Sequence, residues 1–205
     1  MSDGQLILVS APSGAGKTSL VKAIMQQDAQ LSVSISHTTR TQRSTEQDGV
    51  NYYFIDDAEF NAMIATQAFL EHAQVFDHQY GTSRAEVERL MQAGKDVILE
   101  IDWQGADQVR AVMPDAVSVF ILPPSIRALE QRLTGRGQNS ASSMARRLAE
   151  ARLEIAQAPR YDYLIINDDF DQAVRDMLGI IRTRRLLTGT QLRQNALAQA
   201  ILSDT

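Results

Sequence analysis

The chain has 205 residues, of which 44% are hydrophobic and 22% are charged, a composition typical of a globular domain with one sizeable core. No apolar run approaches the ~18 residues that a membrane span requires, and the N-terminus lacks the basic stretch of a secretory signal. Cysteine is absent, which excludes disulfides and thiolate chemistry, and the net charge of −5 argues against nucleic acid as the main partner. We therefore expect a cytoplasmic protein that binds neither nucleic acid nor a membrane.

Short apolar runs alternate with longer amphipathic segments along most of the chain. In chain order, the predicted elements are the strand Leu6–Ser10, the helix Lys17–Gln27, the strands Val33–Ser36 and Tyr52–Ile55, the helix Ala58–Thr66, the strand Phe69–Phe76, the helix Arg84–Ala93, the strand Val97–Ile101, the helix Gly105–Met113, the strand Val117–Leu122, a helix from Ser125 to about Leu133, the helix Ser142–Gln157, the strand Tyr163–Ile166 and the helix Phe170–Leu187. Buried strands separated by helices predict an α/β fold in which helices cover both faces of a parallel sheet.

Three segments depart from this alternation. Val33–Phe76 is richer in strand signals and aromatic residues, so we interpret it as an inserted β-rich lobe outside the parallel sheet. Thr134–Ser143 is polar and contains glycine, which favours the tip of a mobile lid. The tail beyond Thr188 is interpreted as a surface or oligomer helix, so self-association as a homo-oligomer is left open.

A phosphate-binding loop stands between the first strand and the first helix. The P-loop pattern is met except that alanine replaces its first glycine, and alanine is tolerated there if its φ angle is negative. Glycines let backbone N–H groups converge on phosphate oxygens, and the following helix adds its dipole. Lys17 can reach the β- and γ-phosphates of a nucleoside triphosphate, and the Thr18 hydroxyl can hold Mg²⁺. The loop consists of Ala11, Pro12, Ser13, Gly14, Ala15, Gly16, Lys17 and Thr18.

The strand Val97–Ile101 ends beside two carboxylates, Glu100 and Asp102. Ligands of open α/β sheets bind beyond the carboxyl ends of the strands, so Asp102 is suited to bind Mg²⁺ directly or through water. The same side chain could instead cap the helix that follows it. For Asp102 alone the two interpretations are equal, and the neighbouring phosphate-binding loop favours the metal.

Several further motifs occur in one order along the chain. They are Ser36-His37-Thr38-Thr39-Arg40 with Arg43 and Glu46, Asn51-Tyr52-Tyr53-Phe54, Phe69-Leu70-Glu71, Tyr80-Gly81-Thr82, Glu100-Ile101-Asp102-Trp103-Gln104-Gly105, Gly135-Arg136-Gly137 and Ile166-Asn167-Asp168-Asp169. From about Leu6 to Arg185, the chain closely resembles the guanylate kinase family of the bacterial type. The resemblance implies that ATP and GMP are the partners, with Mg²⁺-dependent transfer of the γ-phosphoryl group to GMP, and to dGMP, giving GDP and ADP.

The resemblance also implies a P-loop nucleoside monophosphate kinase fold with three parts. The P-loop core would comprise residues 1–35, 83–133 and 158–205, with the parallel sheet flanked by helices. The β-rich GMP-binding lobe would comprise residues 36–82, and a helical lid would comprise residues 134–157.

The side chains of the inserted lobe have the chemistry that GMP requires. Arg40 and Arg43 can bind a phosphate bidentately, and the hydroxyls of Tyr52 and Tyr80 can add hydrogen bonds. A carboxylate accepts both the ring N–H and the amino group of guanine, and the resemblance assigns that role to Glu71. Taken singly, each residue also fits a structural role in a solvated loop, an exposed strand face or a half-buried core. The resemblance completes the GMP site with Ser36, Gly81, Thr82 and Glu100.

Arginines of the predicted lid would neutralise the transferring phosphoryl group. Arg132 and Arg136 are four residues apart, so they share a face if the helix continues. By the family pattern, Arg132, Arg136 and Arg147 close over the phosphoryl group. They would act with Lys17 and Arg40 as the catalytic residues.

The chain also departs from the family pattern in ways that leave questions open. Gln42 and Thr45 replace the usual proline and glycine beside the two lobe arginines, which puts the rigidity of this loop in doubt. Glu100 replaces the usual aspartate, so it could act on guanine, on Mg²⁺ or on neither. Two alternatives are another P-loop small-molecule kinase and a non-catalytic guanylate-kinase-like interaction module. The retained Lys17 and Thr18 argue against the second alternative.

Overall fold

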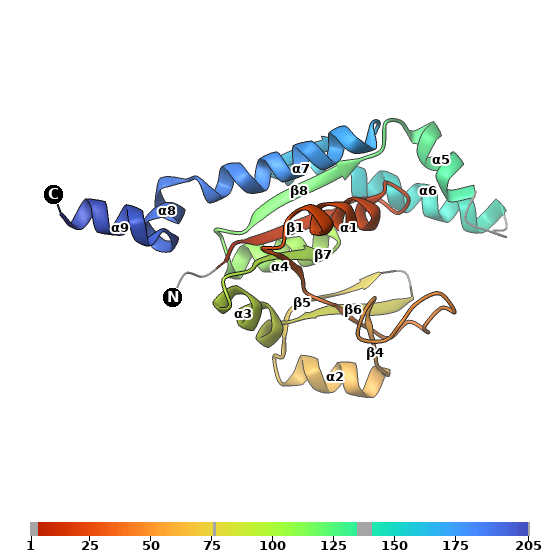
Figure 1. The fold of residues 1–205 in the computed structure, drawn as a ribbon. Coiled ribbons are helices and arrows are strands. Elements are labelled where there is room, and N and C mark those ends of the chain that lie inside the picture. The colour runs from red at the N-terminus through yellow and green to blue at the C-terminus, as the bar shows by residue number, and fades with distance from the viewer. Residues whose placement is uncertain (1–3, 76, 135–140, 205) are drawn as a thin grey trace.

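A computed structural model describes residues 4–75, 77–134 and 141–204, which form two sheets with helices around them (Figure 1). The larger sheet has five strands, and all of its neighbouring strands are parallel. This sheet confirms the predicted α/β fold. Its strands, in spatial order, are β2 (Leu31–Val33), β7 (Asp96–Glu100), β1 (Leu6–Ser10), β8 (Val117–Leu122) and β9 (Tyr163–Ile166).

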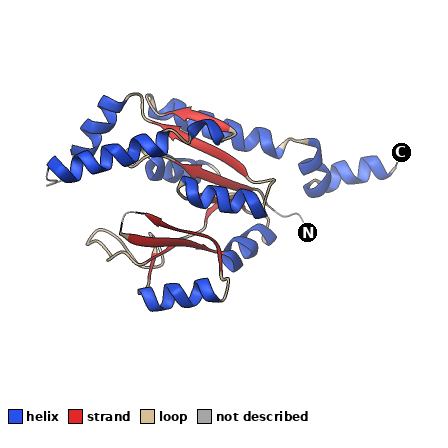
Figure 2. Ribbon diagram, turned by 180° about the vertical axis from the view of Figure 1, so that it is seen from behind, coloured by secondary structure: helices blue, strands red, loops and turns tan. Residues whose placement is uncertain are grey.

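Helices cover both faces of the larger sheet because its central strands are apolar on both sides (Figure 2). On β1, Ile7 and Val9 pack in one cluster with side chains of α1 and α7, while Leu6 and Leu8 pack in another with side chains of α3 and α4. Successive side chains of a strand point to opposite faces, so one strand belongs to both clusters. The helices are α1 (Lys17–Gln27), α3 (Arg84–Gln92), α4 (Trp103–Val112) and α7 (Phe170–Arg185).

The smaller sheet is formed by three strands from the segment Val33–Phe76, which was predicted to be rich in strands, and by a fourth strand that follows it. Its order is β4 (Tyr53–Phe54), β3 (His37–Thr38), β6 (His78–Ser83) and β5 (Phe69–Val75). The helix α2 (Asp57–Ala65) packs on it through Phe60, which is fully buried with its ring centroid 4.6 Å from that of Phe69.

Three details of the strand prediction were wrong. The strand β3 was not predicted, because its two residues stand in a polar stretch and become a strand through pairing with β4 and β6. The predicted strand Val33–Ser36 is displaced, because Val33 ends β2 in the parallel sheet and not in the smaller one. The strand β6 was not predicted, since its sequence His-Gln-Tyr-Gly-Thr-Ser lacks apolar alternation and becomes a strand through pairing on both of its edges.

The remaining elements follow β8 and β9. Two helices, α5 (Ile126–Thr134) and α6 (Ala141–Ile155), pack through a small cluster that includes Leu129, Leu133 and Ala151, and the short 3-10 helix η1 (Ala158–Arg160) follows them. The predicted lid tip, Thr134–Ser143, lies largely outside the described residues. The last helices, α8 (Thr188–Gln194) and α9 (Ala196–Ser203), extend away from the body (Figure 1). Within the described ranges, no helix combines the length and apolar character needed to cross a bilayer.

Candidate active site

A cleft of about 280 Å³ opens beyond the carboxyl ends of β1 and β7. Its lining comes from both sheets and from the loop between β1 and α1, so one cavity contains residues predicted for ATP and residues predicted for GMP. This is the position at which open α/β sheets bind ligands. The predicted residues that line it are Ala11, Pro12, Ser13, Gly14, Gly16, Lys17, Thr18, Ser36, Tyr52, Glu71, Tyr80, Glu100 and Asp102.

The phosphate-binding loop depends on two glycines and on a buried amide beneath it. Gly14 and Gly16 have φ angles of 91° and 97°, which side chains with a Cβ rarely adopt. The Asn167 side chain donates a hydrogen bond of 2.7 Å to the Ala15 carbonyl, and a Cβ on Gly16 would collide with that same amide. Among the described non-glycine residues only Gln67 has a positive φ, so Ala11 meets the condition under which alanine is tolerated.

Lys17 begins α1 and lies between the loop and the end of β7. Its Nζ is 3.5 Å from the carbonyl oxygen of Ile101, which also accepts a hydrogen bond of 2.8 Å from the Ser10 hydroxyl. Because these bonds go to a neutral carbonyl, the ammonium keeps its charge available for an anionic ligand in the cleft.

Oxygen-bearing side chains line the same cleft as Lys17. The Thr18 hydroxyl donates a hydrogen bond of 2.8 Å to Glu100 Oε2. Asp102 caps α4, since its Oδ1 accepts the Gly105 N–H at 2.9 Å and its Oδ2 accepts Gln104 Nε2 at 2.9 Å. The described residues contain no cluster of three or more Asp, Glu or His that could enclose a metal by itself. One hydroxyl and two carboxylates around the cleft fit Mg²⁺, which takes one or two carboxylates together with substrate phosphates.

Glu71 is a buried carboxylate with only 4% of its surface exposed. It accepts a hydrogen bond of 2.5 Å from the Thr82 hydroxyl, and Thr82 is itself fully buried. Burial raises the pKa of Glu71 to about 7, although the Thr82 bond and the nearby Lys17 favour the ionised form. A side chain on an alternating strand usually faces solvent, whereas this one points into the cleft.

Arg40 stands at the rim of the smaller sheet in an ordered loop. Its guanidinium forms an ion pair of 2.8 Å with Glu46 and lies 5.5 Å from the ring centroid of Tyr52. Glu46 also accepts the Arg43 N–H at 2.9 Å, and its carbonyl accepts Gln42 Nε2 at 2.7 Å. These hydrogen bonds hold both sides of the loop against Glu46.

Two tyrosines form the wall beside Arg40. The rings of Tyr52 and Tyr80 meet edge to face with their centroids 5.8 Å apart. Burial raises the pKa of Tyr52 to about 12, so its hydroxyl stays protonated and can donate a hydrogen bond at neutral pH.

Comparison with known proteins shows the family of the chain. The model of the guanylate kinase family matches residues 3–184.

The chain belongs to the guanylate kinase family.

The guanylate kinase of Hahella chejuensis is 56% identical over 205 residues, which are 100% of this chain and 99% of that protein. The guanylate kinase of Salmonella typhimurium is 50% identical over 207 aligned residues, which cover 100% of this chain and 100% of that protein. The crystal structure of guanylate kinase from Anaplasma phagocytophilum superposes with a TM-score of 0.80 at 31% identity and covers 99% of this chain and 96% of that one. The family resemblance is thus confirmed, and with it the activity of a nucleoside monophosphate kinase.

Some of the predicted site residues do not line the cleft. Arg132 donates a hydrogen bond of 3.3 Å to the Asn167 carbonyl, and Arg147 is half-buried on α6. Arg136 lies outside the described residues, so its prediction is not examined by the structure. The other predicted residues that are absent from the cleft lining are Ala15, Arg40, Arg43, Gly81 and Thr82.

Glu154 is a cleft residue that the sequence analysis missed. It projects from α6 and lines the cleft, where the nearby Ser13 N–H of the phosphate-binding loop favours its ionised form. Burial raises its pKa to about 7, while Lys17 favours its ionised form. The sequence could have indicated this residue. Glu154 follows Arg147, a predicted catalytic residue, by seven positions, so the two lie on the same face of a helix two turns apart.

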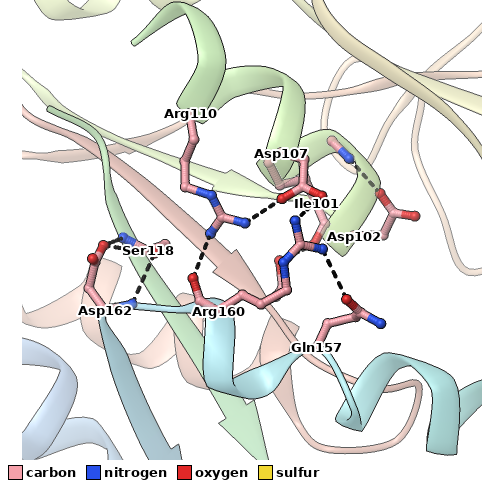
Figure 3. A network of polar contacts seen from close by, with 10 residues as sticks. Ile101, Asp102, Asp107, Arg110, Ser118, Gln157, Arg160 and Asp162 are labelled. Atoms are coloured by element: carbon pink, nitrogen blue, oxygen red, sulfur yellow. Dashed lines mark hydrogen bonds and ion pairs between the residues drawn. The ribbon is translucent and has the colours of Figure 1, made fainter. Parts of the chain in front are cut away.

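A network of charged and polar residues connects α4 to η1 and to Gln157, just after the end of α6 (Figure 3). Asp107 on α4 forms ion pairs of 2.6 Å with Arg110 and 2.7 Å with Arg160, and Arg160 also donates to Gln157 at 3.0 Å. These bonds connect η1 to the helix that Asp102 caps. The segment carrying Glu154 is therefore tied to the same helix that borders the cleft.

Proposed function

We propose that the cleft binds MgATP and GMP together and transfers the γ-phosphoryl group directly to a phosphate oxygen of GMP, giving ADP and GDP. The observation that carries this proposal is a single cavity lined by Lys17 and Thr18 on one side and by the buried Glu71 on the other. The membership in the guanylate kinase family supports the same two substrates.

On the ATP side, the backbone N–H groups of the phosphate-binding loop and the Lys17 ammonium would hold the β- and γ-phosphates. Thr18 and Asp102, with Glu100 beside them, would hold Mg²⁺, which neutralises phosphate charge when it is bound. The hydrogen bond between Thr18 and Glu100 supports this grouping, because it brings the hydroxyl and a carboxylate to one point at the cleft wall.

On the GMP side, Glu71 would accept the ring N–H and the amino group of guanine. Both donors favour the ionised carboxylate, so guanine binding would lower the pKa of Glu71 from its raised value near 7. A base without these donors would leave a buried carboxylate unpaired, which is strongly unfavourable. Arg40, Tyr52 and Tyr80 would bind the phosphate of GMP, with Arg43, Ser36, Gly81 and Thr82 completing the site.

Transfer would require positioning and charge neutralisation and no strong general base, because an ionised phosphate oxygen is the nucleophile. Arg132, Arg147 and Arg136 would approach the phosphoryl group when the lid and the GMP lobe close. Closure would also exclude water, which would otherwise hydrolyse ATP.

A coupled assay of ADP release tests the proposal across GMP, dGMP, AMP, CMP, UMP and a ribose bisphosphate. We expect GMP and dGMP to be phosphorylated and the others to react at least a hundredfold more slowly. Activity with a different acceptor, and none with GMP, would contradict the proposal and favour another small-molecule kinase.

The variant Glu71→Gln tests the base site separately. It should raise the KM for GMP by about two orders of magnitude and change the KM for ATP by less than threefold, since only guanine contacts this carboxylate. The matched control is Glu88→Gln, which alters an exposed glutamate on α3 and should leave both constants unchanged. Equal losses for GMP and ATP would contradict the assigned role of Glu71.

A further inference from the structure

The strand β5 is an edge of the smaller sheet in the part of the chain that the structure describes. Backbone groups on its outer side would be unpaired unless another element covered them. Two glutamines of α4 reach this edge. Gln108 Oε1 accepts the His72 N–H at 3.1 Å, Gln108 Nε2 donates to the His72 carbonyl at 2.7 Å, and Gln104 Nε2 contacts the Gln74 carbonyl at 3.5 Å.

The spacing of these contacts matches the geometry of the two elements. Gln104 and Gln108 are four residues apart on a helix, which is about 6 Å along its axis. His72 and Gln74 are two residues apart on a strand, which is about 6.7 Å along its length. The two side-chain amides therefore follow the edge of β5 in the way that a neighbouring strand would, and α4 and β5 lie in contact.

This edge holds the carboxylate proposed to recognise guanine. Glu71 directly precedes His72, and its side chain lies against Gly105 of α4, where a Cβ would be 2.9 Å from Glu71 Cδ. Gly105 stands between the two glutamines on the same helix. Gln104 also donates to Asp102 at 2.9 Å, so the glutamine pair connects the capped start of α4 to the strand that carries Glu71.

We propose that Gln108 is a positioning residue for guanine recognition. It pairs with both backbone groups of His72 and so fixes the position of the Glu71 carboxylate against Gly105, where the smaller sheet meets α4. The inference rests on the proposed role of Glu71. Gln108 is itself exposed and outside the cleft lining, so its effect must pass through the strand.

Steady-state kinetics with GMP, IMP and ATP test this inference on the full-length enzyme. IMP lacks the amino group of guanine, so the preference for GMP over IMP reports how well Glu71 meets both guanine donors. Gln108→Ala removes two hydrogen bonds and should raise the KM for GMP about tenfold, with kcat and the KM for ATP within twofold of the wild type. The preference for GMP over IMP should fall by at least threefold, a change that a merely structural role would not produce.

Two further variants sharpen the test. Gln108→Met keeps the length of the side chain and removes both hydrogen bonds, so it should behave as Gln108→Ala does. Gln26→Ala changes an exposed glutamine on α1 and should match the wild type in every constant.

The outcomes separate this inference from the proposed function. If Gln108→Ala or Gln108→Met matches Gln26→Ala while Glu71→Gln loses GMP selectively, the positioning role is wrong and the base site stands. If Gln108→Ala raises the KM for GMP and ATP equally, the positioning role is also wrong. If Glu71→Gln itself loses no selectivity for GMP, the proposed base site is wrong, and the positioning role of Gln108 is wrong with it.

Discussion

At the scale of single residues, Glu71 lies where ionisation is unfavourable. Its pKa is raised from 4.5 to about 7 by burial, so the folded state prefers the protonated form. An acid with a raised pKa contributes stability that is fully present below its unfolded pKa and is lost as pH rises through its folded pKa. The stability that Glu71 contributes to the wild-type protein should therefore decrease as pH rises from about 4.5 to about 7.

Glu71→Gln should consequently be more stable than the wild type at pH 8, by roughly 1–3 kcal/mol, because the amide carries no charge to desolvate. At pH 4 the gain should vanish, since Glu71 is then neutral as well. Urea unfolding at both pH values measures the difference. The variant Glu88→Gln is the control, and an equal gain at the two pH values would contradict burial as the cause.

Gly16 is a second residue whose identity follows from its surroundings. Gly16→Ala would place a Cβ at a φ of 97° and against the amide of Asn167, so it should lower stability by about 1–3 kcal/mol and weaken MgATP binding at least tenfold.

Gly179 provides a matched control for this substitution. It lies in α7, and a Cβ there meets nothing within 4 Å. Gly179→Ala should raise stability by about 0.5–1 kcal/mol through helix propensity and leave MgATP affinity unchanged. Thermal unfolding and calorimetric titration measure both effects, and a Gly16→Ala protein that binds MgATP normally would contradict the account.

At the scale of elements, six of the described helices begin directly after a residue whose side chain accepts a backbone N–H. The capping residues are Asp56, Ser83, Asp102, Ser125, Asp169 and Asn195. Such caps are local in sequence, which is why helix starts could be predicted closely. Asp102 differs from the others because it caps a helix and also lines the cleft.

Two substitutions at Asp102 separate its two functions. Asp102→Asn keeps a good cap and removes the charge, so stability should stay within about 0.5 kcal/mol while kcat with MgATP falls at least tenfold. Asp102→Ala should lower kcat similarly and also lower stability by about 1 kcal/mol. Chemical denaturation and kinetics across Mg²⁺ concentrations measure these effects. Full activity of Asp102→Asn would exclude a metal role and leave only the cap.

At the scale of the whole molecule, Arg185 connects three distant segments at the amino ends of the parallel strands. At the end of α7 it forms ion pairs of 2.6 Å with Asp28, which follows α1, and 2.6 Å with Asp96, which begins β7. Asp96 also accepts the Gln5 N–H at 2.8 Å. Burial alone would raise the pKa of Asp28, but the hydrogen bonds from Arg185 and the Gln30 N–H, together with the charges of Arg185 and Arg182, lower that pKa below 3.8.

Arg185→Met should reduce stability by roughly 2–4 kcal/mol at pH 7, because two largely buried carboxylates lose their partner. A lowered pKa contributes stability that is present above the unfolded pKa and is lost as pH falls through the folded pKa. The difference from the wild type should therefore shrink below about pH 4.

Thermal unfolding as a function of pH measures that difference. Arg182→Met, one turn earlier and exposed, is the control and should change stability by less than 1 kcal/mol. The kcat should be unchanged in both variants, since the cleft lies at the opposite ends of the strands. A pH-independent loss would contradict the ionic origin of the effect.

The sequence by itself determined the local features of this protein. The strands Leu6–Ser10, Val117–Leu122 and Tyr163–Ile166 and the helix Lys17–Gln27 all have the predicted bounds. Hydrophobic periodicity, glycine conformation and helix capping act within a few residues, so a single chain displays them directly. The order of the lobe and lid motifs was enough to indicate the family, which the comparisons then confirmed.

Only the tertiary structure decided which distant side chains meet. Glu71 contacts Gly105, Glu154 lies near Ser13, and Gln108 pairs with His72 because strand register and helix packing bring together residues that are far apart in the chain. Periodicity shows which face a residue occupies and not what lies opposite that face. For the same reason β6 escaped prediction, since its polar sequence becomes a strand through the partners on its two sides.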